Sequence, residues 1–122
     1  MAKKEVNEKV KPLTLRDTES GEEFVLEFNR ESIRFAEARG FDINDVAKYP
    51  LTKIPELFFY AFRMHHKNIA RERTDRILFD DLGGLPDGAL ERLALLYSEP
   101  FNALTNTAEN GESKNSKVMV EF

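Results

Sequence analysis

The sequence contains no cysteine in its 122 residues. Without thiolates there is no disulfide, no cysteine nucleophile and no cysteine-based zinc or iron–sulfur site. No apolar run approaches the roughly 20 residues that a membrane-spanning helix needs. We therefore expect a soluble, cytoplasmic protein that has no membrane partner.

A strong excess of charge of either sign is also missing. Lys and Arg number 18 and Asp and Glu 22, which gives a formal net charge of −4. This balance creates no overall field that would attract nucleic acid or anionic lipid, so nucleic acid is not the expected partner. With 41% hydrophobic residues, a chain of this length supports one modest core.

The distribution of residue types predicts three segments. Residues 1–11 alternate Lys and Glu around two valines and are expected to form a flexible N-terminal arm. Residues 12–106 carry the apolar patterns of a single globular domain. Residues 107–122 are expected to form a flexible tail, which ends in VMVEF, a candidate isolated strand or docking peptide.

Alternating apolar residues predict a β-hairpin at the start of the domain. Leu13 and Leu15 share one face of LTLRD, while EFVLEF places Phe24, Leu26 and Phe28 on one face. The connecting TESGE contains Gly21, at a position where a turn needs positive φ.

Helical periodicity dominates the rest of the domain. Asn29 is expected to cap a first helix that stops at Gly40, and Asp42 to cap a short helical turn. Thr52 is expected to cap a second main helix, with Pro55 in its first turn. Further helices are predicted over residues 69–82 and 89–101. The predicted fold class is α+β, mostly α, with an N-terminal β-hairpin followed by a small bundle of about three main helices.

Candidate reactive residues lack the spacing that chemistry requires. His65 and His66 are adjacent in a predicted helix, whereas two histidines that bind one metal from a helix are three or four residues apart. Asp80 and Asp81 diverge in the same way and do not aim at one pocket. No catalytic, metal-binding or cofactor-binding residue is predicted, and we expect a protein that is not an enzyme.

Arg71, Arg73 and Arg76, with Lys67, form a local basic stretch. It leaves open an alternative in which IARERTDRILFDDLGGLPDGALERL acts as a helix–turn–helix-like, DNA-associated regulator. Glu72 and Asp75 interrupt the stretch, which favours a salt-bridged helix surface instead.

Aromatic residues are abundant, with ten Phe and three Tyr. Four of them are difficult to place on the same core side as their neighbours. Apolar surface that a small monomer leaves uncovered is typically a binding face or an oligomer interface. The predicted protein-binding residues are therefore Phe59, Tyr60, Phe79 and Phe101.

The order of these elements resembles a known family. A hairpin ending in EFNRESIRFAEARGFD, the segment LFFYAFRMHHKNIARERTDRILFDDLGGL and a leucine-rich last helix running into SEPFNALTN are similar to the tail assembly chaperones of long-tailed bacteriophages, of the type found in phages and prophages of Gram-positive bacteria. The resemblance covers roughly residues 12–106.

This resemblance implies a non-enzymatic role in the cytoplasm of a bacterial host cell. Such chaperones bind the tape measure protein, a long and largely helical chain, keep it soluble and assist assembly of the tail tube. The implied partners are the tape measure protein and the tail tube protein, together with self-association. In many such phages a ribosomal frameshift extends the chaperone into a longer form.

Overall fold

A β-hairpin and a group of short helices make up the described part of the chain. The computed structural model describes residues 9–104, 118 and 120–122. The predicted arm and tail therefore lie mostly outside the described residues. Within the arm, Val10 is half-buried and its N–H donates to Glu99 Oε2 at 2.8 Å, so contacts with the domain extend into this segment.

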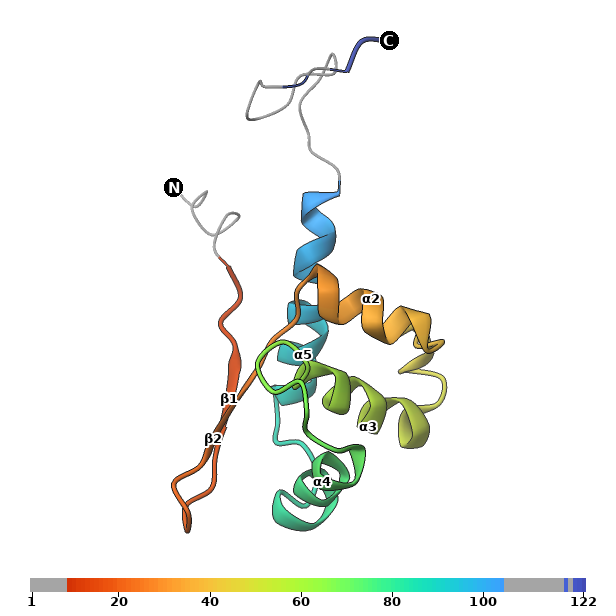
Figure 1. The fold of residues 1–122 in the computed structure, drawn as a ribbon. Helices are drawn as coiled ribbons and strands as arrows, with labels where there is room; N and C mark the ends of the chain where they lie inside the picture. The colour runs from red at the N-terminus through yellow and green to blue at the C-terminus, as the bar shows by residue number, and fades with distance from the viewer. Residues whose placement is uncertain (1–8, 105–117, 119) are drawn as a thin grey trace.

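The hairpin forms where the alternation predicts it. Strand β1 (Leu13–Arg16) pairs antiparallel with β2 (Glu23–Leu26), and Leu15 lies opposite Phe24. Gly21 has φ of 80° in the connecting turn, as expected. Phe24 and Leu26 are buried, and the hairpin crosses one side of the helices (Figure 1).

Four α-helices follow within the described residues, which confirms the predicted α+β, mostly α class (Figure 1). They are α2 (Arg30–Ala38), α3 (Pro50–Ala61), α4 (Arg71–Arg76) and α5 (Ala89–Ser98). The 3-10 turn η1 (Ile43–Asp45) precedes α3, the π-helical turn η2 (Ile77–Asp81) extends α4, and the 3-10 turn η3 (Glu99–Ala103) extends α5.

The ends of α2 follow the predicted chemistry. Asn29 Oδ1 accepts the Ser32 N–H at 2.8 Å, and Ser32 Oγ accepts the Asn29 N–H at 2.9 Å. Both backbone N–H groups, which have no partner within the helix, thus donate to side chains. At the other end Gly40 has φ of 86°, and the Phe41 N–H returns to the Ala36 carbonyl at 3.1 Å. The predicted stop at Gly40 is confirmed, and its hydrogen bonds are those of a Schellman motif.

The predicted start of α3 is wrong. The helix begins at Pro50 rather than after Thr52, and Tyr49 at the N-cap makes no side-chain hydrogen bond. Proline suits the first helical position because its missing N–H would have no partner there. Pro55 consequently lies inside the helix, beyond its first turn.

The predicted helical position of His65 and His66 is also wrong. Helix α3 ends at Ala61, and both histidines lie in the turns that follow. The edge of β2 competes for this part of the chain: the Glu27 N–H donates to the Ala61 carbonyl at 3.0 Å, and the Val25 N–H donates to His66 Nε2 at 3.0 Å. These two contacts attach the turn to the hairpin.

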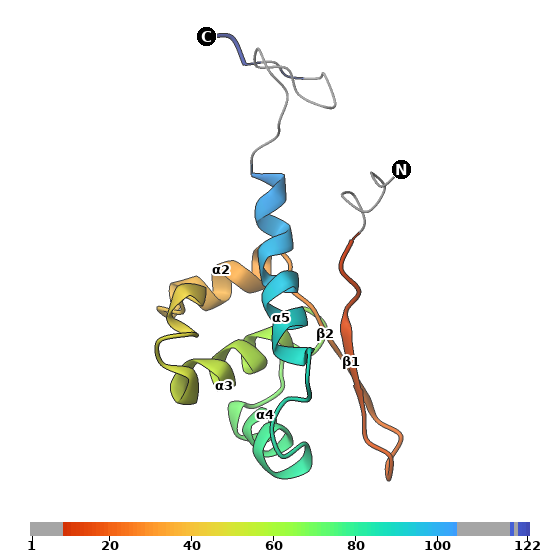
Figure 2. The same ribbon diagram turned by 180° about the vertical axis from the view of Figure 1, so that it is seen from behind.

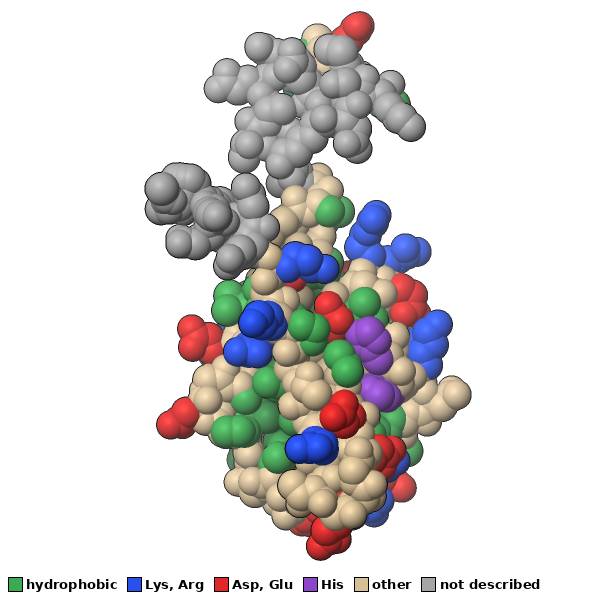
Figure 3. Space-filling view, turned by 90° about the vertical axis from the view of Figure 1, so that its left-hand side faces the viewer, with side chains coloured by type: hydrophobic (Ala, Val, Ile, Leu, Met, Phe, Trp, Pro, Cys, Tyr) green, Lys and Arg blue, Asp and Glu red, His purple; other side chains and the backbone are tan. Residues whose placement is uncertain are grey.

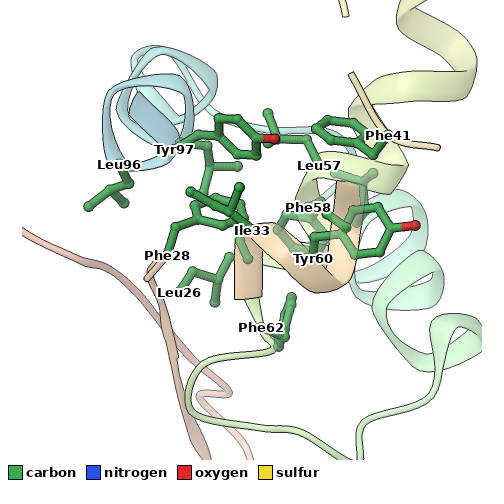
Figure 4. Close-up of a cluster of buried hydrophobic side chains, with 14 of the residues drawn as sticks. Leu26, Phe28, Ile33, Phe41, Leu57, Phe58, Tyr60, Phe62, Leu96 and Tyr97 are labelled. Atoms are coloured by element: carbon green, nitrogen blue, oxygen red, sulfur yellow. The ribbon is translucent and has the colours of Figure 1, made fainter. Parts of the chain in front are cut away.

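The core lies between the hairpin, α2, α3 and α5. Aromatic rings meet edge to face within it, including Phe28 with Tyr97 at 5.1 Å and Phe58 with Phe62 at 5.1 Å between ring centroids (Figure 4). Leu57, Phe58 and Phe62 are completely buried. Most of the Phe and Tyr surplus seen in the sequence is therefore used inside the domain.

Candidate protein-binding surface

An apolar hollow opens between the start of α3 and the segment that joins η2 to α5. Its volume is about 310 Å³. We call it the apolar groove. Its lining residues are Pro50, Leu51, Ile54, Pro55, Leu78, Phe79, Gly84, Leu85 and Leu90. None of them carries a charge, so the groove can bind another apolar surface and offers no group for acid–base chemistry.

Two of the side chains that line the groove are strongly exposed to solvent. Leu51 is 89% exposed on the first turn of α3, and Phe79 is 55% exposed on η2. The π-helical turn shifts the register of its side chains, with the Leu82 N–H donating to the Ile77 carbonyl at 2.8 Å. Turns of this type occur often at functional sites. Here Ile77 and Leu78 are buried while Phe79 faces outward.

Of the four predicted binding residues, only Phe79 lines this groove. Phe101 is 38% exposed and lies beside a second hollow of about 480 Å³, which also contains Glu37 and Asp42. Its ring is 5.8 Å from that of Tyr97. The structure therefore does not bring Phe79 and Phe101 into one site.

The expected exposure of Tyr60 is wrong. Tyr60 is 7% exposed, and its ring meets Phe41 at 5.4 Å and Phe35 at 6.1 Å. Burial is the main cause that raises the pKa of its hydroxyl. Phe59 is half-buried, with the guanidinium carbon of Arg71 at 5.9 Å from its ring centre. The short connection from α2 to α3 folds Phe41 over Tyr60, which helical periodicity alone did not reveal.

Leu51 and the residues around Gly84 were missed by the sequence reasoning. Leu51 was missed because the predicted start of α3 was too late, so that Leu51 was taken to precede the helix. The available signal was the proline at position 50, which is favoured at the first position of a helix and would have placed Leu51 on its first turn.

The two histidines hold the turn after α3 against the hairpin. His65 Nε2 is 2.9 Å from Glu27 Oε1, while His66 accepts the Val25 N–H. Burial, followed by the neighbouring His65, lowers the pKa of His66. The neutral ring is the form that can accept this hydrogen bond. Within the described residues, no group of three or more His, Cys, Asp or Glu side chains is arranged to hold a metal ion.

Two of the four basic residues in this stretch, Arg71 and Arg73, are paired with carboxylates. Arg71 Nε is 2.9 Å from Asp75 Oδ1, and an Arg73 terminal nitrogen is 2.7 Å from Glu22 Oε1 on the hairpin. The second helix of the predicted helix–turn–helix, α5, buries Leu93, Leu96 and Tyr97 in the core. Both features reduce what this segment can offer to a DNA backbone.

A family described as a domain of unknown function, DUF5055, matches residues 1–122. The chain belongs to this family. Comparison with curated proteins and with solved structures found no match. In the described ranges, no helix is both long and apolar enough to cross a membrane.

Proposed function

We propose that this protein is a non-enzymatic assembly chaperone that binds a helical client through the apolar groove. The observation that carries the proposal is the exposure of Leu51 and Phe79 on either side of an uncharged hollow. The resemblance of the sequence to phage tail assembly chaperones implies that the client is the tape measure protein of a long-tailed bacteriophage. It implies the tail tube protein as a further partner.

The groove suits one stripe of an amphipathic helix. Such a stripe presents apolar side chains at positions i, i+3 or i+4, and i+7, which fit a hydrophobic groove. Burial of apolar surface contributes about 25 cal/mol per Å². Aromatic side chains near the centre of an interface often carry much of its binding energy, which gives Phe79 a central role.

Self-association in the absence of client is part of the proposal. Leu51, Phe79 and the nearby Leu82, which is 37% exposed, form apolar surface that a second copy could cover. Client and second copy would then compete for one face. Addition of client is expected to convert oligomers of this protein into the complex.

The decisive experiment is co-production of this protein with the long helical tail protein, followed by measurement of the mass of the soluble complex. Leu51→Asp and Phe79→Asp place a charge in the groove and are expected to abolish co-purification while circular dichroism stays unchanged. Leu104→Asp is the matched control, because Leu104 is 66% exposed at the end of η3 and does not line the groove.

The proposal fails if both groove variants bind the client as well as the native chain does. Duplex DNA provides a separate comparison. Binding to DNA that appears at low salt and weakens steeply as salt rises would instead favour the DNA-associated alternative.

A further inference from the structure

The outer edge of β1 is an unpaired strand edge. The N–H groups of Val25 in β2 and of Glu27 just after β2 point away from β1, because they donate to His66 and to the Ala61 carbonyl. Val25 lies opposite Thr14. In an antiparallel pair, two directly opposite residues either both direct their N–H and C=O groups at the partner strand or both direct them away from it. The N–H of Val25 points away from β1, so the N–H and C=O of Thr14 point away from β2, toward the outer edge.

Nothing in the described part of the chain pairs with this edge. The N–H groups of Thr14 and Arg16 donate no hydrogen bond to any described residue. A hairpin of two strands is marginal by itself, and an open strand edge is a template for another strand. The opposite edge, along β2, is already occupied by the turn after α3.

Helix α5 provides an apolar neighbour for this edge. Arg92 and Glu99 contact the chain just before β1, through the Pro12 carbonyl at 3.4 Å and the Val10 N–H at 2.8 Å. Leu95 lies between them on the same helical face and is 49% exposed. Helix α5 contacts β1 on this side of the molecule (Figure 2), and Figure 3 shows hydrophobic side chains across the hairpin side.

We propose that residues 118–122 of the same chain, VMVEF, add to the outer edge of β1 as a third strand. Val118, Val120 and Phe122 alternate, so a strand places all of them on one face. All are exposed in the structure, at 76%, 55% and 102%. Docking on β1 turns them toward the face that carries Leu13 and Leu15, next to Leu95.

Charge selects this edge over the apolar groove. On a docked strand, Glu121 points to the outer face, where the exposed Arg16 has Glu23 of β2 opposite it on one side and the added strand on the other. Exposed Lys11 adds a second positive charge near the start of β1. Beside the groove, Asp80, Asp81 and Asp87 are all exposed and would repel Glu121, and the neighbouring Lys53 is already paired with Glu56 at 3.3 Å.

The connection is long enough. Residues 105–117 separate the segment from η3, and these 13 residues span at most about 43–47 Å when fully extended. A domain of about 100 residues has a radius of gyration near 13 Å. Any surface of its own domain is thus within reach, and the covalent connection favours the same chain over a second copy through its high effective concentration.

A nitroxide spin label at Ser116→Cys tests the proposal in the full chain, which has no other cysteine. The amide signals of Thr14 and Arg16 are expected to broaden. Broadening of Leu51 and Phe79 instead would place the segment in the groove, and no broadening in the domain would leave it undocked. Broadening seen only when tagged and isotope-labelled chains are mixed would mean a second copy. Each of these three results overturns the proposal.

Two further variants separate strand pairing from other contacts. Thr14→Pro removes the outward N–H without removing a hydrogen bond of the hairpin and is expected to abolish the broadening of the remaining Arg16 amide signal. Thr14→Val, the matched control, keeps the N–H and should retain it. In the unlabelled chain, Val120→Asp is expected to raise the hydrogen exchange rates of the Thr14 and Arg16 amides at least tenfold. Unchanged rates would contradict strand addition.

Discussion

The two ends of α3 lie in different surroundings although they belong to one helix. At its C-terminal end Leu57, Phe58 and Phe62 are completely buried against the hairpin, α2 and α5. At its N-terminal end Leu51 is 89% exposed, and Pro50 and Ile54 line the open groove. Similar apolar residues therefore have different surroundings: those at one end stabilise the domain, and those at the other leave apolar surface open to solvent.

The largest expected effect on stability is at the buried end. Phe62→Ala removes a ring that contacts Phe24 at 5.5 Å and Phe58 at 5.1 Å between centroids. We expect the free energy of unfolding to fall by about 3–5 kcal/mol, because a large cavity remains in a packed core. Urea denaturation measures the change. A loss comparable to that of a surface substitution would contradict the distinction between the two ends.

A smaller effect on the free energy of unfolding is expected at the start of α2, the helix that packs against the buried end of α3. Asn29→Ala removes the side-chain cap on the Ser32 N–H. The free energy of unfolding should fall by about 1 kcal/mol. Asn29→Asp, which keeps an accepting oxygen, is the control for thermal unfolding. An equal loss in both variants would show that the cap is not responsible.

Acid should weaken the attachment of the turn after α3. The folded-state pKa of His66 is lowered below its ordinary value of 6.5. The unfolded chain therefore binds more protons than the folded chain as pH falls below about 6.5. The contribution of His66 to stability is complete above that pH and is lost as pH falls through the folded-state pKa.

His66→Gln provides the comparison, because its amide can accept the Val25 N–H and does not titrate. We expect the fall in thermal stability between pH 7 and pH 5 to be smaller in this variant than in the native chain. Parallel pH curves would mean that His66 does not cause the acid sensitivity.

The smallest effect on stability is expected at the open end. Leu51→Ala should change the free energy of unfolding by no more than about 0.5 kcal/mol, as for an exposed residue. The same substitution should weaken client binding measurably in a titration. A large loss of stability would show that Leu51 supports the fold, and the contrast between the two ends of α3 would disappear.

Several local features followed from neighbouring residues alone. Alternation predicted the hairpin, Asn29 predicted the start of α2, and Gly40 predicted its end. Asp42 caps η1 as expected, since its side chain accepts the Asn44 N–H at 2.9 Å. In each case the decisive contact lies within a few residues along the chain, so residue type and spacing suffice.

The sequence by itself thus determined the fold class, the hairpin and the caps of α2 and η1. Tertiary structure decided where α3 ends, because the edge of β2 takes its last carbonyl and His66. It also decided which aromatics are covered: Phe41 arrives from a distant segment to bury Tyr60, while no described segment covers Phe79. Burial depends on contacts between segments far apart in sequence, and helical periodicity specifies only which residues share a face.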